Sequence, residues 1–324
     1  MASYNKQLLS KQAQELGFIR DTFEKMVRLA EILKFISGDP LLSKALALKG
    51  GTAINLMIFN LPRLSIDIDL DYSCNNSKNE MIEGRRDITN ILGSYMAAEN
   101  YELSGKSKTH HSLDSFVYAY TNSAGVKDNI KIEINYSLRA HILPFITKSI
   151  ETMGVFAKTT VLSVAPTEIF GSKIVALLTR TAARDLYDIN NMVALGLIDE
   201  SKAATLRKCM IFYFTLASDE VPESFDIGKI HNLTNYRIRT DLQPVLRKKE
   251  RFDLFSAQNR VEKYLTELRL NFLCWTKMNS NILTLSVKTS TNRNCYLRSP
   301  IYWNAYGITL WHFGNQTGIN SAFQ

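Results

Sequence analysis

Three aspartates alternate along one short stretch of the sequence: Asp67, Asp69 and Asp71 within LSIDIDLDY at residues 64–72. Apolar residues separate them, so the alternation predicts a strand with all three carboxylates on one face. A buried carboxylate is unfavourable unless a positive charge lies beside it. Carboxylates at this spacing can converge on two metal ions about 3.5–4 Å apart, as in two-metal phosphoryl transfer. We therefore predict that Asp67 and Asp69 bind two Mg²⁺ ions, whereas Asp71 lies near the strand end, where water could solvate it.

A Gly-Gly-Thr turn precedes this strand and offers a place for a polyphosphate. Gly50 and Gly51 lack a Cβ, which lets the backbone approach a ligand closely. Thr52 begins a short predicted helix, where its hydroxyl and the unpaired N–H groups could bind an anion. Ser65 lies two residues before Asp67, so we expect it on the same face of the strand. A glycine pair alone is usually only a turn, and the order of turn, helix and acidic strand is what indicates a nucleotide site.

A third carboxylate stands on another alternating stretch, NIKIEINYSL at residues 129–138. Glu133 falls between Ile132 and Ile134, so it faces away from the apolar side of this predicted strand. If the strand lies beside the aspartates, Glu133 supplies a metal ligand or a general base for an attacking hydroxyl. A solvent-facing glutamate on a half-buried strand accounts for the pattern equally well, and the residues leave both interpretations open.

Lys173 and the group Arg184, Asp185 and Asp188 stand within a largely apolar helical stretch at residues 166–193. A lysine supplies a compact charge for phosphate, and a buried lysine needs a partner such as Asp188. An exposed helix face with an i,i+4 pair between Arg184 and Asp188 accounts for the same spacing. Judged on these residues alone, the exposed face is the favoured interpretation.

The periodicity of apolar residues predicts the elements that must hold these groups. Helices are expected at residues 21–36, 52–59, 79–100, 167–196 and 254–272, and strands at 64–72, 115–122 and 129–138. The turn-rich SAGVKD between the last two strands predicts a hairpin, and a helix break near Thr181 is possible. We expect an α/β (α+β) catalytic domain at 1–160, a helical domain at 161–274 and an acid-free tail of unknown role at 275–324.

Composition narrows the class of protein. The chain of 324 residues has no apolar run of 18 residues for a membrane span and no apolar segment of a signal peptide at its start. Its four cysteines are scattered, without the spacing of a disulfide framework or a zinc site. We expect a cytoplasmic protein without a membrane partner. The net charge of +8 fits a nucleic-acid or nucleotide partner about as well as an ordinary soluble protein.

Several separated motifs together resemble one family. KGGTAINL, RLSIDIDL and EIFGSKIVALLTRTAARDLYDI resemble the AbiEii/AbiGii-type nucleotidyltransferase toxins of the DNA polymerase β-like nucleotidyltransferase superfamily. The resemblance covers roughly residues 15–270, including PVLRKKERFDLFSAQNRVEKYL, and does not extend to the tail. It implies a polymerase β-like fold with a mixed sheet, followed by a mainly helical C-terminal domain.

The same resemblance implies a function. The protein would be a bacterial toxin of a toxin–antitoxin or abortive-infection system that uses Mg²⁺ and a nucleoside triphosphate. It would transfer a nucleotide to an acceptor, above all the 3′ end of tRNA, and so block translation. A cognate antitoxin, often a winged-helix DNA-binding protein, would be encoded beside it.

The residue patterns and the resemblance together give two sets of predicted site residues. The predicted catalytic residues, of which the first three also bind metal, are Asp67, Asp69, Glu133, Lys173 and Asp188. The predicted nucleotide-binding residues are Gly50, Gly51, Thr52, Ser65, Lys173, Arg184 and Asp185. Glu133 matches the family less closely than the others because the family's second motif varies.

Besides a general nucleic-acid-binding module, which the charge supports only weakly, two alternatives to the tRNA enzyme stay open, because a fold does not fix a substrate. In the first, the same fold transfers a nucleotide to a small molecule or to a protein hydroxyl. In the second, a degenerate nucleotidyltransferase fold serves only to bind a partner. The intact aspartate pair argues against the second, and the basic cluster RKKER at residues 247–251 slightly favours a nucleic-acid acceptor.

Overall fold

A computed structural model gives the fold and describes residues 4–59, 61–138, 141–150, 158–217, 226–268, 301–304 and 307–310. The chain forms two units, Met1–Arg269 and Leu270–Gln324. In the second unit, the described residues form an antiparallel pair of strands, β9 (Ile301–Asn304) and β10 (Gly307–Leu310). The rest of the predicted tail lies outside the described residues. Every predicted site residue belongs to the first unit, and the boundary expected at residue 160 within that unit stays a prediction.

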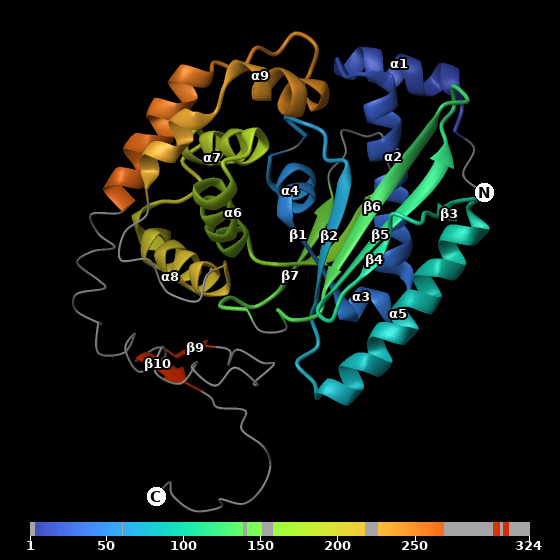
Figure 1. The fold of residues 1–324 in the computed structure, drawn as a ribbon, viewed down its shortest axis with the longest axis horizontal. Helices are drawn as coiled ribbons and strands as arrows, with labels where there is room; N and C mark the ends of the chain where they lie inside the picture. Colours follow the sequence, from blue (N-terminus) through green and yellow to red (C-terminus); the bar gives the residue numbers. More distant parts are fainter. Residues whose placement is uncertain are drawn as a thin grey trace, which may run out of the picture. The chain divides into compact units, whose positions relative to one another are not determined.

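One mixed sheet frames the first unit (Figure 1). Its strand order is β3-β5-β6-β2-β1-β8-β7, with β4 paired to β5. Strand β2 runs antiparallel to β1 and parallel to β6, so the mixed sheet predicted from the sequence is confirmed. The predicted hairpin is the β5–β6 pair. The strands are β1 (Leu46–Lys49), β2 (Asp67–Tyr72), β3 (Glu102–Leu103), β4 (Lys108–Thr109), β5 (Leu113–Thr121), β6 (Lys127–Asn135), β7 (Ile146–Ile150) and β8 (Thr159–Ser163).

Helices cover both faces of this sheet. The α-helices are α1 (Lys6–Leu16), α2 (Arg20–Gly38), α3 (Leu42–Ala45), α4 (Gly50–Ala53), α5 (Lys78–Ala98), α6 (Pro166–Arg180), α7 (Ala183–Ala194), α8 (Glu200–Ala217), α9 (Asn235–Arg237) and a helix at 254–268. The π-helical turns are η1 (Ile54–Ile58) and η3 (Ile238–Leu242), and the 3₁₀ turns are η2 (Ile227–Asn232) and η4 (Gln243–Val245).

The predicted helices are present, with one of them divided. Thr181 has a φ of 50° in the left-handed region and separates α6 from α7, as the possible break near this residue suggested. The predicted helix 254–272 is observed over 254–268, and its last residues lie outside the described residues. Among the described residues, no helix has the length and apolarity that crossing a bilayer requires.

The apolar face of the central strands packs against α2 and α5. Ile68 and Leu70 of β2 are buried on this face, and Leu48 of β1 lies directly opposite Leu70. Burying each such side chain contributes roughly 1.5–3 kcal/mol. Helix α5 is fastened by an ion pair in which Arg85 Nη2 lies 2.6 Å from Oδ1 of the buried Asp114 on β5. This packing fixes β2 and therefore the opposite, acidic face of the same strand.

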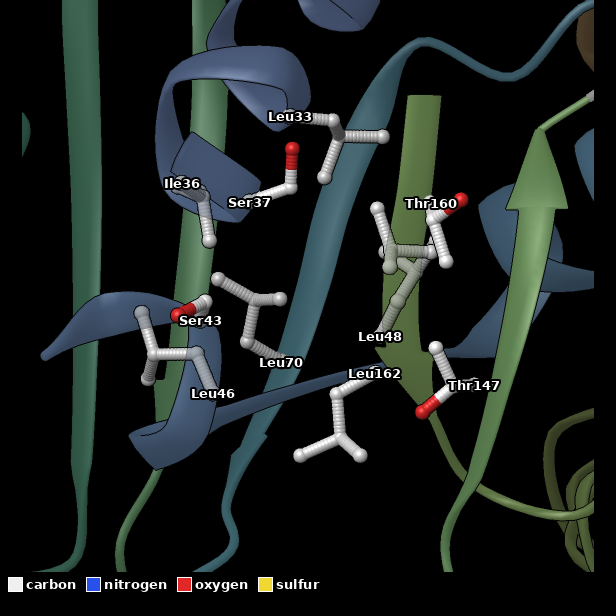
Figure 2. A pocket seen from close by; sticks show the side chains of 11 residues that line it. Leu33, Ile36, Ser37, Ser43, Leu46, Leu48, Leu70, Thr147, Thr160 and Leu162 are labelled. Atoms are coloured by element: carbon white, nitrogen blue, oxygen red, sulfur yellow. The ribbon is translucent and has the colours of Figure 1, made fainter. Parts of the chain in front are cut away.

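A cavity of about 230 Å³ lies on the apolar face, between α2 and the strands β1, β2, β7 and β8 (Figure 2). Leucine side chains, including Leu48 and Leu70, line it together with a few hydroxyl groups. The next pair in register, Lys49 and Asp69, points to the other face because side chains alternate along a strand. The sheet therefore separates this cavity from the predicted site.

The acidic face of β2 is covered by α4 and η1, with α6 and α7 next to them (Figure 1). Gly171 lets α6, which carries Lys173, approach α8 closely. A Cβ at Gly171 would lie 2.6 Å from the Cβ of Cys209 and 3.3 Å from the backbone nitrogen of Met210. The position of Lys173 therefore depends on the absence of a side chain two residues earlier.

We expect Gly171→Ala to lower the free energy of unfolding by about 1–3 kcal/mol, because overpacking forces α6 and α8 apart. Urea denaturation measures this change. Gly93→Ala on α5 is the matched control, because nothing lies within 4 Å of the added Cβ there. Alanine favours a helix over glycine by up to about 1 kcal/mol, so the control should be neutral or more stable. A Gly171→Ala variant as stable as the wild type would contradict the close packing of these helices.

Candidate active site

A row of charged side chains crosses three neighbouring strands. Asp69 on β2 lies directly opposite Lys49 on β1 and Glu133 on β6. Cross-strand neighbours share a face, so Glu133 lies beside the aspartates, as one of the two interpretations of its stretch required. Its carboxylate forms an ion pair with Lys131 Nζ at 2.8 Å and is partly exposed. Asp67 lies on the same face one step along β2, so the structure brings the three predicted metal-binding carboxylates to one surface.

The electrostatics of Asp69 show how closely these charges influence one another. Burial raises the pKa of Asp69 above its ordinary value, and the like charges of Asp67 and Glu133 add to the increase. The positive charges of Lys49 and Lys173 act to lower this pKa. They are outweighed by burial and the two carboxylates, so the pKa stays raised. A carboxylate surrounded in this way is ionised more easily when a cation binds beside it. This face of β2 therefore has the electrostatic character of a cation-binding surface.

The donor set suits magnesium held jointly with a substrate. Among the described residues, no three His, Cys, Asp or Glu side chains are grouped as a ready-made metal site. Mg²⁺ is commonly held by one or two carboxylates, with substrate phosphates and water completing the octahedron. Asp67 and Asp69 match that requirement, and Glu133 as a third ligand stays a prediction.

The two glycines bring the start of α4 against charged side chains. Gly50 has a φ of +68°, and a Cβ built there would overlap the Asp69 carboxylate, with Cγ only 3.1 Å away. A Cβ on Gly51 would lie 2.8 Å from Nη2 of Arg63. The two glycines therefore let this turn approach the charged groups of the site closely, and its approach to a ligand stays a prediction.

The hydroxyl groups of Thr52 and Ser65 fasten α4 to β2. Thr52 is fully buried, its Oγ1 lies 2.7 Å from Oγ of Ser65, and it donates a hydrogen bond to the backbone carbonyl of Asp67. Both hydroxyls are thus engaged inside the protein and hold the acidic strand in place. Their direct contact with a nucleotide stays a prediction.

The expectation that water solvates Asp71 is wrong. This side chain is fully buried, and its Oδ1 accepts a hydrogen bond of 2.5 Å from Lys49 Nζ. Its Oδ2 lies 3.6 Å from Nε2 of His141, whose Nδ1 is 3.0 Å from Oε1 of the buried Glu168. The position near a strand end did not reveal the loop and the helix α6 that cover Asp71. Asp71 therefore holds Lys49 in the row that contains Asp69.

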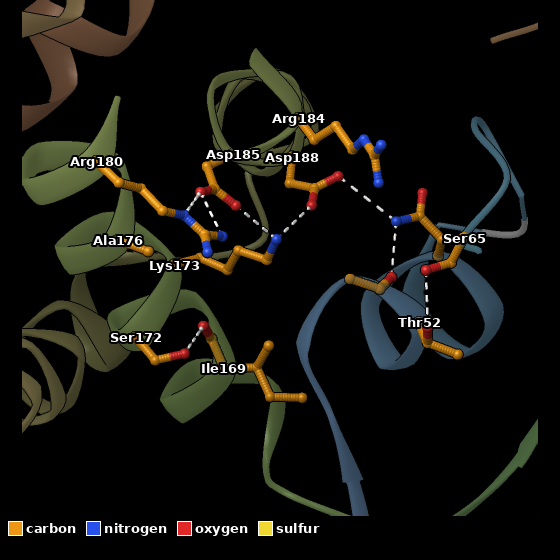
Figure 3. A network of polar contacts seen from close by, with 12 residues as sticks. Thr52, Ser65, Ile169, Ser172, Lys173, Ala176, Arg180, Arg184, Asp185 and Asp188 are labelled. Atoms are coloured by element: carbon orange, nitrogen blue, oxygen red, sulfur yellow. Dashed lines mark hydrogen bonds and ion pairs between the residues drawn. The ribbon is translucent and has the colours of Figure 1, made fainter. Parts of the chain in front are cut away.

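A second network of charges lies between α6 and α7, next to α4 (Figure 3), and Arg63 from the segment before β2 joins it. Arg63 binds Asp188 with two hydrogen bonds, Nε to Oδ1 at 2.9 Å and Nη2 to Oδ2 at 2.7 Å. Lys173 Nζ lies 3.1 Å from Asp188 Oδ2 and 2.7 Å from Asp185 Oδ1. All four side chains are buried. The prediction that a buried Lys173 needs a partner such as Asp188 is confirmed.

The favoured interpretation of this helical stretch as an exposed face with an Arg184–Asp188 pair is wrong. Asp185 and Asp188 are buried, and Asp188 binds Arg63, which lies 125 residues earlier in the chain. Spacing along a helix cannot reveal such a partner. Arg184 instead donates a hydrogen bond of 2.9 Å from Nε to the backbone carbonyl of Asp241. Among the described residues, Arg184 forms no ion pair, and Figure 3 shows it pointing toward the segment that carries Thr52.

The network is ionised and carries an excess of positive charge. Burial opposes the charge on Asp188, but Arg63 and Lys173 outweigh it and hold the pKa of Asp188 below its ordinary value. Burial lowers the pKa of Arg184, and Arg63 lowers it further. Arg180 adds a third cation through its ion pair with Asp185 at 2.7 Å. Three cations therefore meet two carboxylates, and the unpaired Arg184 increases the excess.

Three residues of the site were not predicted from the sequence. Lys49 directly precedes the glycine pair, a position that could have drawn attention to it. Arg63 and Asn55 gave no signal, because their partners are distant in sequence. Asn55 Nδ2 donates to the carbonyl of Gly51 at 2.8 Å and lies 3.5 Å from Asp188 Oδ1. It therefore connects the glycine turn to the buried ion network.

The structure thus brings together paired aspartates on a central strand, a glycine turn and a buried lysine, which are the groups predicted for a nucleotidyltransferase site. The family model described as nucleotidyl transferase AbiEii toxin, type IV toxin–antitoxin system, matches residues 34–266. This match spans more than half of the chain, so the chain belongs to the AbiEii family. It is a nucleotidyltransferase toxin of a type IV toxin–antitoxin system, which confirms the resemblance drawn from the motifs.

A solved structure shares the fold. MenT4, a nucleotidyltransferase toxin from Mycobacterium tuberculosis H37Rv, matches with a TM-score of 0.62 and 14% sequence identity. The match covers 89% of this chain and 99% of that chain. At this identity the likeness shows the fold, and it confirms the predicted fold class. The comparison with curated proteins gave no match.

We expect Gly50→Ala to weaken binding of a Mg²⁺–nucleoside triphosphate by more than about tenfold, because the new methyl group displaces the Asp69 carboxylate. Isothermal titration calorimetry measures this affinity. Gly125→Ala is the matched control, because Gly125 has a φ of +80° with nothing within 4 Å. Both variants carry the backbone strain of alanine in the left-handed region, on the order of 1–2 kcal/mol, and only Gly50→Ala disturbs the acidic strand. Equal affinity in the two variants would contradict this account of the glycine turn.

Proposed function

We propose that this protein transfers a nucleoside monophosphate from a Mg²⁺-bound nucleoside triphosphate to the 3′-terminal hydroxyl of tRNA, and thereby blocks translation. The observation that carries the proposal is the opposition of charges across the site. Asp67 and Asp69 face a cationic network centred on Lys173. Burial raises the pKa of Asp69, and the charge of Lys173 is close enough to oppose part of that increase. A metal-bound triphosphate is the ligand that satisfies both sides, with metal on the carboxylates and phosphate oxygens on the cations.

Each side of the site has a separate task in this proposal. Asp67 and Asp69 would hold Mg²⁺, which when bound neutralises the phosphates and increases the electrophilicity of the α-phosphorus. Lys173 stabilises the charge that develops on the β- and γ-phosphates as pyrophosphate leaves. Asp185 and Asp188 keep Lys173 protonated, because their charges outweigh its burial and raise its pKa. Arg184, whose pKa burial lowers, gains a partner when a phosphate binds beside it.

The reaction is an in-line substitution at phosphorus. The acceptor hydroxyl oxygen forms a bond to the α-phosphorus, and the bond from that phosphorus to the bridging oxygen of pyrophosphate breaks. The hydroxyl proton needs an acceptor, and we assign this role to Glu133. Its carboxylate lies in register beside Asp69 and is partly exposed, so an incoming hydroxyl can reach it.

The acceptor assignment rests on charge and on the class of system. A toxin must act on a molecule that growth requires, and the basic cluster at residues 247–251 favours a nucleic acid. Membership of a type IV toxin–antitoxin family also implies an antitoxin partner. A winged-helix DNA-binding antitoxin stays a prediction.

The test is an incubation of the purified protein with Mg²⁺, each α-labelled nucleoside triphosphate in turn, and total bacterial tRNA. We expect label in tRNA with one preferred nucleotide, and no label when a chelator removes Mg²⁺. Mutating a residue that only supports a metal ligand typically lowers activity roughly 10–100-fold. Asp67→Asn should lower the rate of transfer by more than this, because Asp67 is proposed to bind the metal directly. Its unfolding free energy should stay the same or rise, because one like charge beside Asp69 is removed.

Two controls separate the possible failures. Lys173→Ala should also abolish transfer, and Lys106→Ala, in an exposed turn, should not. Label on a protein or small molecule in a cell extract, without label on tRNA, would contradict the acceptor while supporting the chemistry. Near-normal transfer by both Asp67→Asn and Lys173→Ala would contradict the assigned site.

A further inference from the structure

One short segment next to the site exposes an aromatic ring among basic side chains. It consists of α9 and η3, residues 235–242, and it directly follows Thr234, the N-cap residue of α9. Ile238 and Leu242 are buried and hold the segment against α7. Tyr236, three residues before Arg239, is 65% exposed, and Arg239 is also exposed. Residues three apart lie on one helix face, so this ring and this guanidinium form one outward surface.

This surface is connected directly to the catalytic groups. Arg184 on α7 donates its hydrogen bond to the carbonyl of Asp241 in η3, and the charge of Asp67 also acts on Arg184. A chain of interactions therefore leads from the acidic strand to Arg184 and from Arg184 to η3. The exposed Tyr236 lies on α9, directly before η3. Figure 1 shows α9 near α7 in the first unit. An acceptor whose end reaches the α-phosphorus beside Asp67 must place its adjoining part on a neighbouring surface such as this one.

The net charge of this segment together with its flanking residues suits an anionic partner. Between residues 226 and 251 the sequence has seven Lys or Arg and three Asp or Glu, so half of the net charge of +8 lies in this short part of the chain. The one carboxylate within residues 235–242, that of Asp241, forms an ion pair with Arg237 at 3.4 Å and accepts a hydrogen bond from Thr240 Oγ1 at 2.8 Å. Among the described residues, Arg239 forms no ion pair. No ion pair within the part of the chain that the structure describes therefore neutralises the exposed charge of Arg239.

We propose that the surface formed by Tyr236 and Arg239 is the docking site for the single-stranded end of the nucleic-acid acceptor. One unpaired base stacks on the ring of Tyr236, and Arg239 binds the adjoining phosphate. This inference rests on the proposed function, and it adds where the acceptor binds and that its end must be unpaired. Base stacking on an aromatic ring tolerates any sequence, and guanidinium groups bind phosphate, so the surface selects an end rather than a sequence.

An acidic protein partner is the other occupant that the charge alone would allow. The exposed ring favours nucleic acid, because every base has a flat face for stacking, whereas an acidic peptide uses only the charge. The link through Arg184 to Asp67 favours the acceptor as well, because only the acceptor must reach the reacting phosphorus.

The experiment uses the full-length protein and three variants, Tyr236→Ala, Tyr236→Phe and Arg239→Ala. Fluorescence anisotropy measures their affinity for a labelled single-stranded 10-nucleotide RNA, a blunt RNA hairpin and a labelled ten-residue polyglutamate peptide. Calorimetry measures binding of Mg²⁺–nucleoside triphosphate by the same proteins. Arg86→Ala on α5 serves as the control for removing an exposed arginine elsewhere.

We expect Tyr236→Ala to bind the single strand about tenfold more weakly and to raise its KM as an acceptor, with unchanged kcat, as the loss of one stacked base requires. Tyr236→Phe keeps the ring and should stay within twofold of the wild type. Arg239→Ala should weaken binding of the single strand. It should also reduce the slope of log affinity against log salt concentration by about one, as the loss of one phosphate contact requires. The hairpin and the nucleoside triphosphate should bind all the variants equally.

Three results would overturn the inference. Wild-type affinity for the single strand in Tyr236→Ala, while the wild type still transfers nucleotide to RNA, would place the acceptor elsewhere and leave the proposed function intact. Binding of polyglutamate that depends on Tyr236 as strongly as binding of RNA would indicate an acidic protein partner. A wild type that neither binds nor labels any RNA would overturn the inference together with its tRNA acceptor.

Discussion

Asp188 lies fully buried between Arg63 and Lys173, and the rest of the site depends on this interaction. Arg63 comes from the segment that leads into the acidic strand, whereas Lys173 and Asp188 come from the helices beyond the sheet. A buried carboxylate and a buried lysine would each be unfavourable alone. Together with Asp185 and Arg180, they form a network in which burial is offset by opposite charges. The helices and the sheet are thereby fixed to each other beside the proposed substrate site.

The opposite surface of the site has the reverse balance. Asp67, Asp69 and Glu133 share one face, and the pKa of Asp69 is raised by burial and by the other two carboxylates. Lys49 relieves part of this excess, because Asp71 holds its ammonium group beside Asp69. The structure thus places two surfaces of opposite charge near each other. The acidic face of β2 has an excess of negative charge, and the network around Lys173 has an excess of positive charge. The proposed transfer from a metal-bound triphosphate would use that difference, because such a substrate brings both charges.

The local elements and the chemistry of the site could be predicted from the sequence, whereas its long-range contacts could not. Alternation identified β2 and β6, and the order of Gly50, Gly51 and the aspartate pair identified the class of site. The errors share one cause. Asp71 and Asp188 look like solvated charges when only their neighbours in sequence are considered, and their partners or covers lie on other elements. Arg63 is the clearest case, because a helix pattern suggested Arg184 as the partner of Asp188.

The most direct test of this account is a double-mutant cycle with Arg63→Met, Asp188→Leu and the double variant. Urea denaturation should show that each single change is strongly destabilising, by about 3–5 kcal/mol, since it leaves a buried charge without its partner. The double variant should recover at least about 2 kcal/mol relative to the sum of the single changes. It should still fail to transfer nucleotide, because Lys173 has lost one of the two carboxylates that position it. Additive destabilisation, or transfer at the wild-type rate by the double variant, would contradict the claim that this ion network holds the site together.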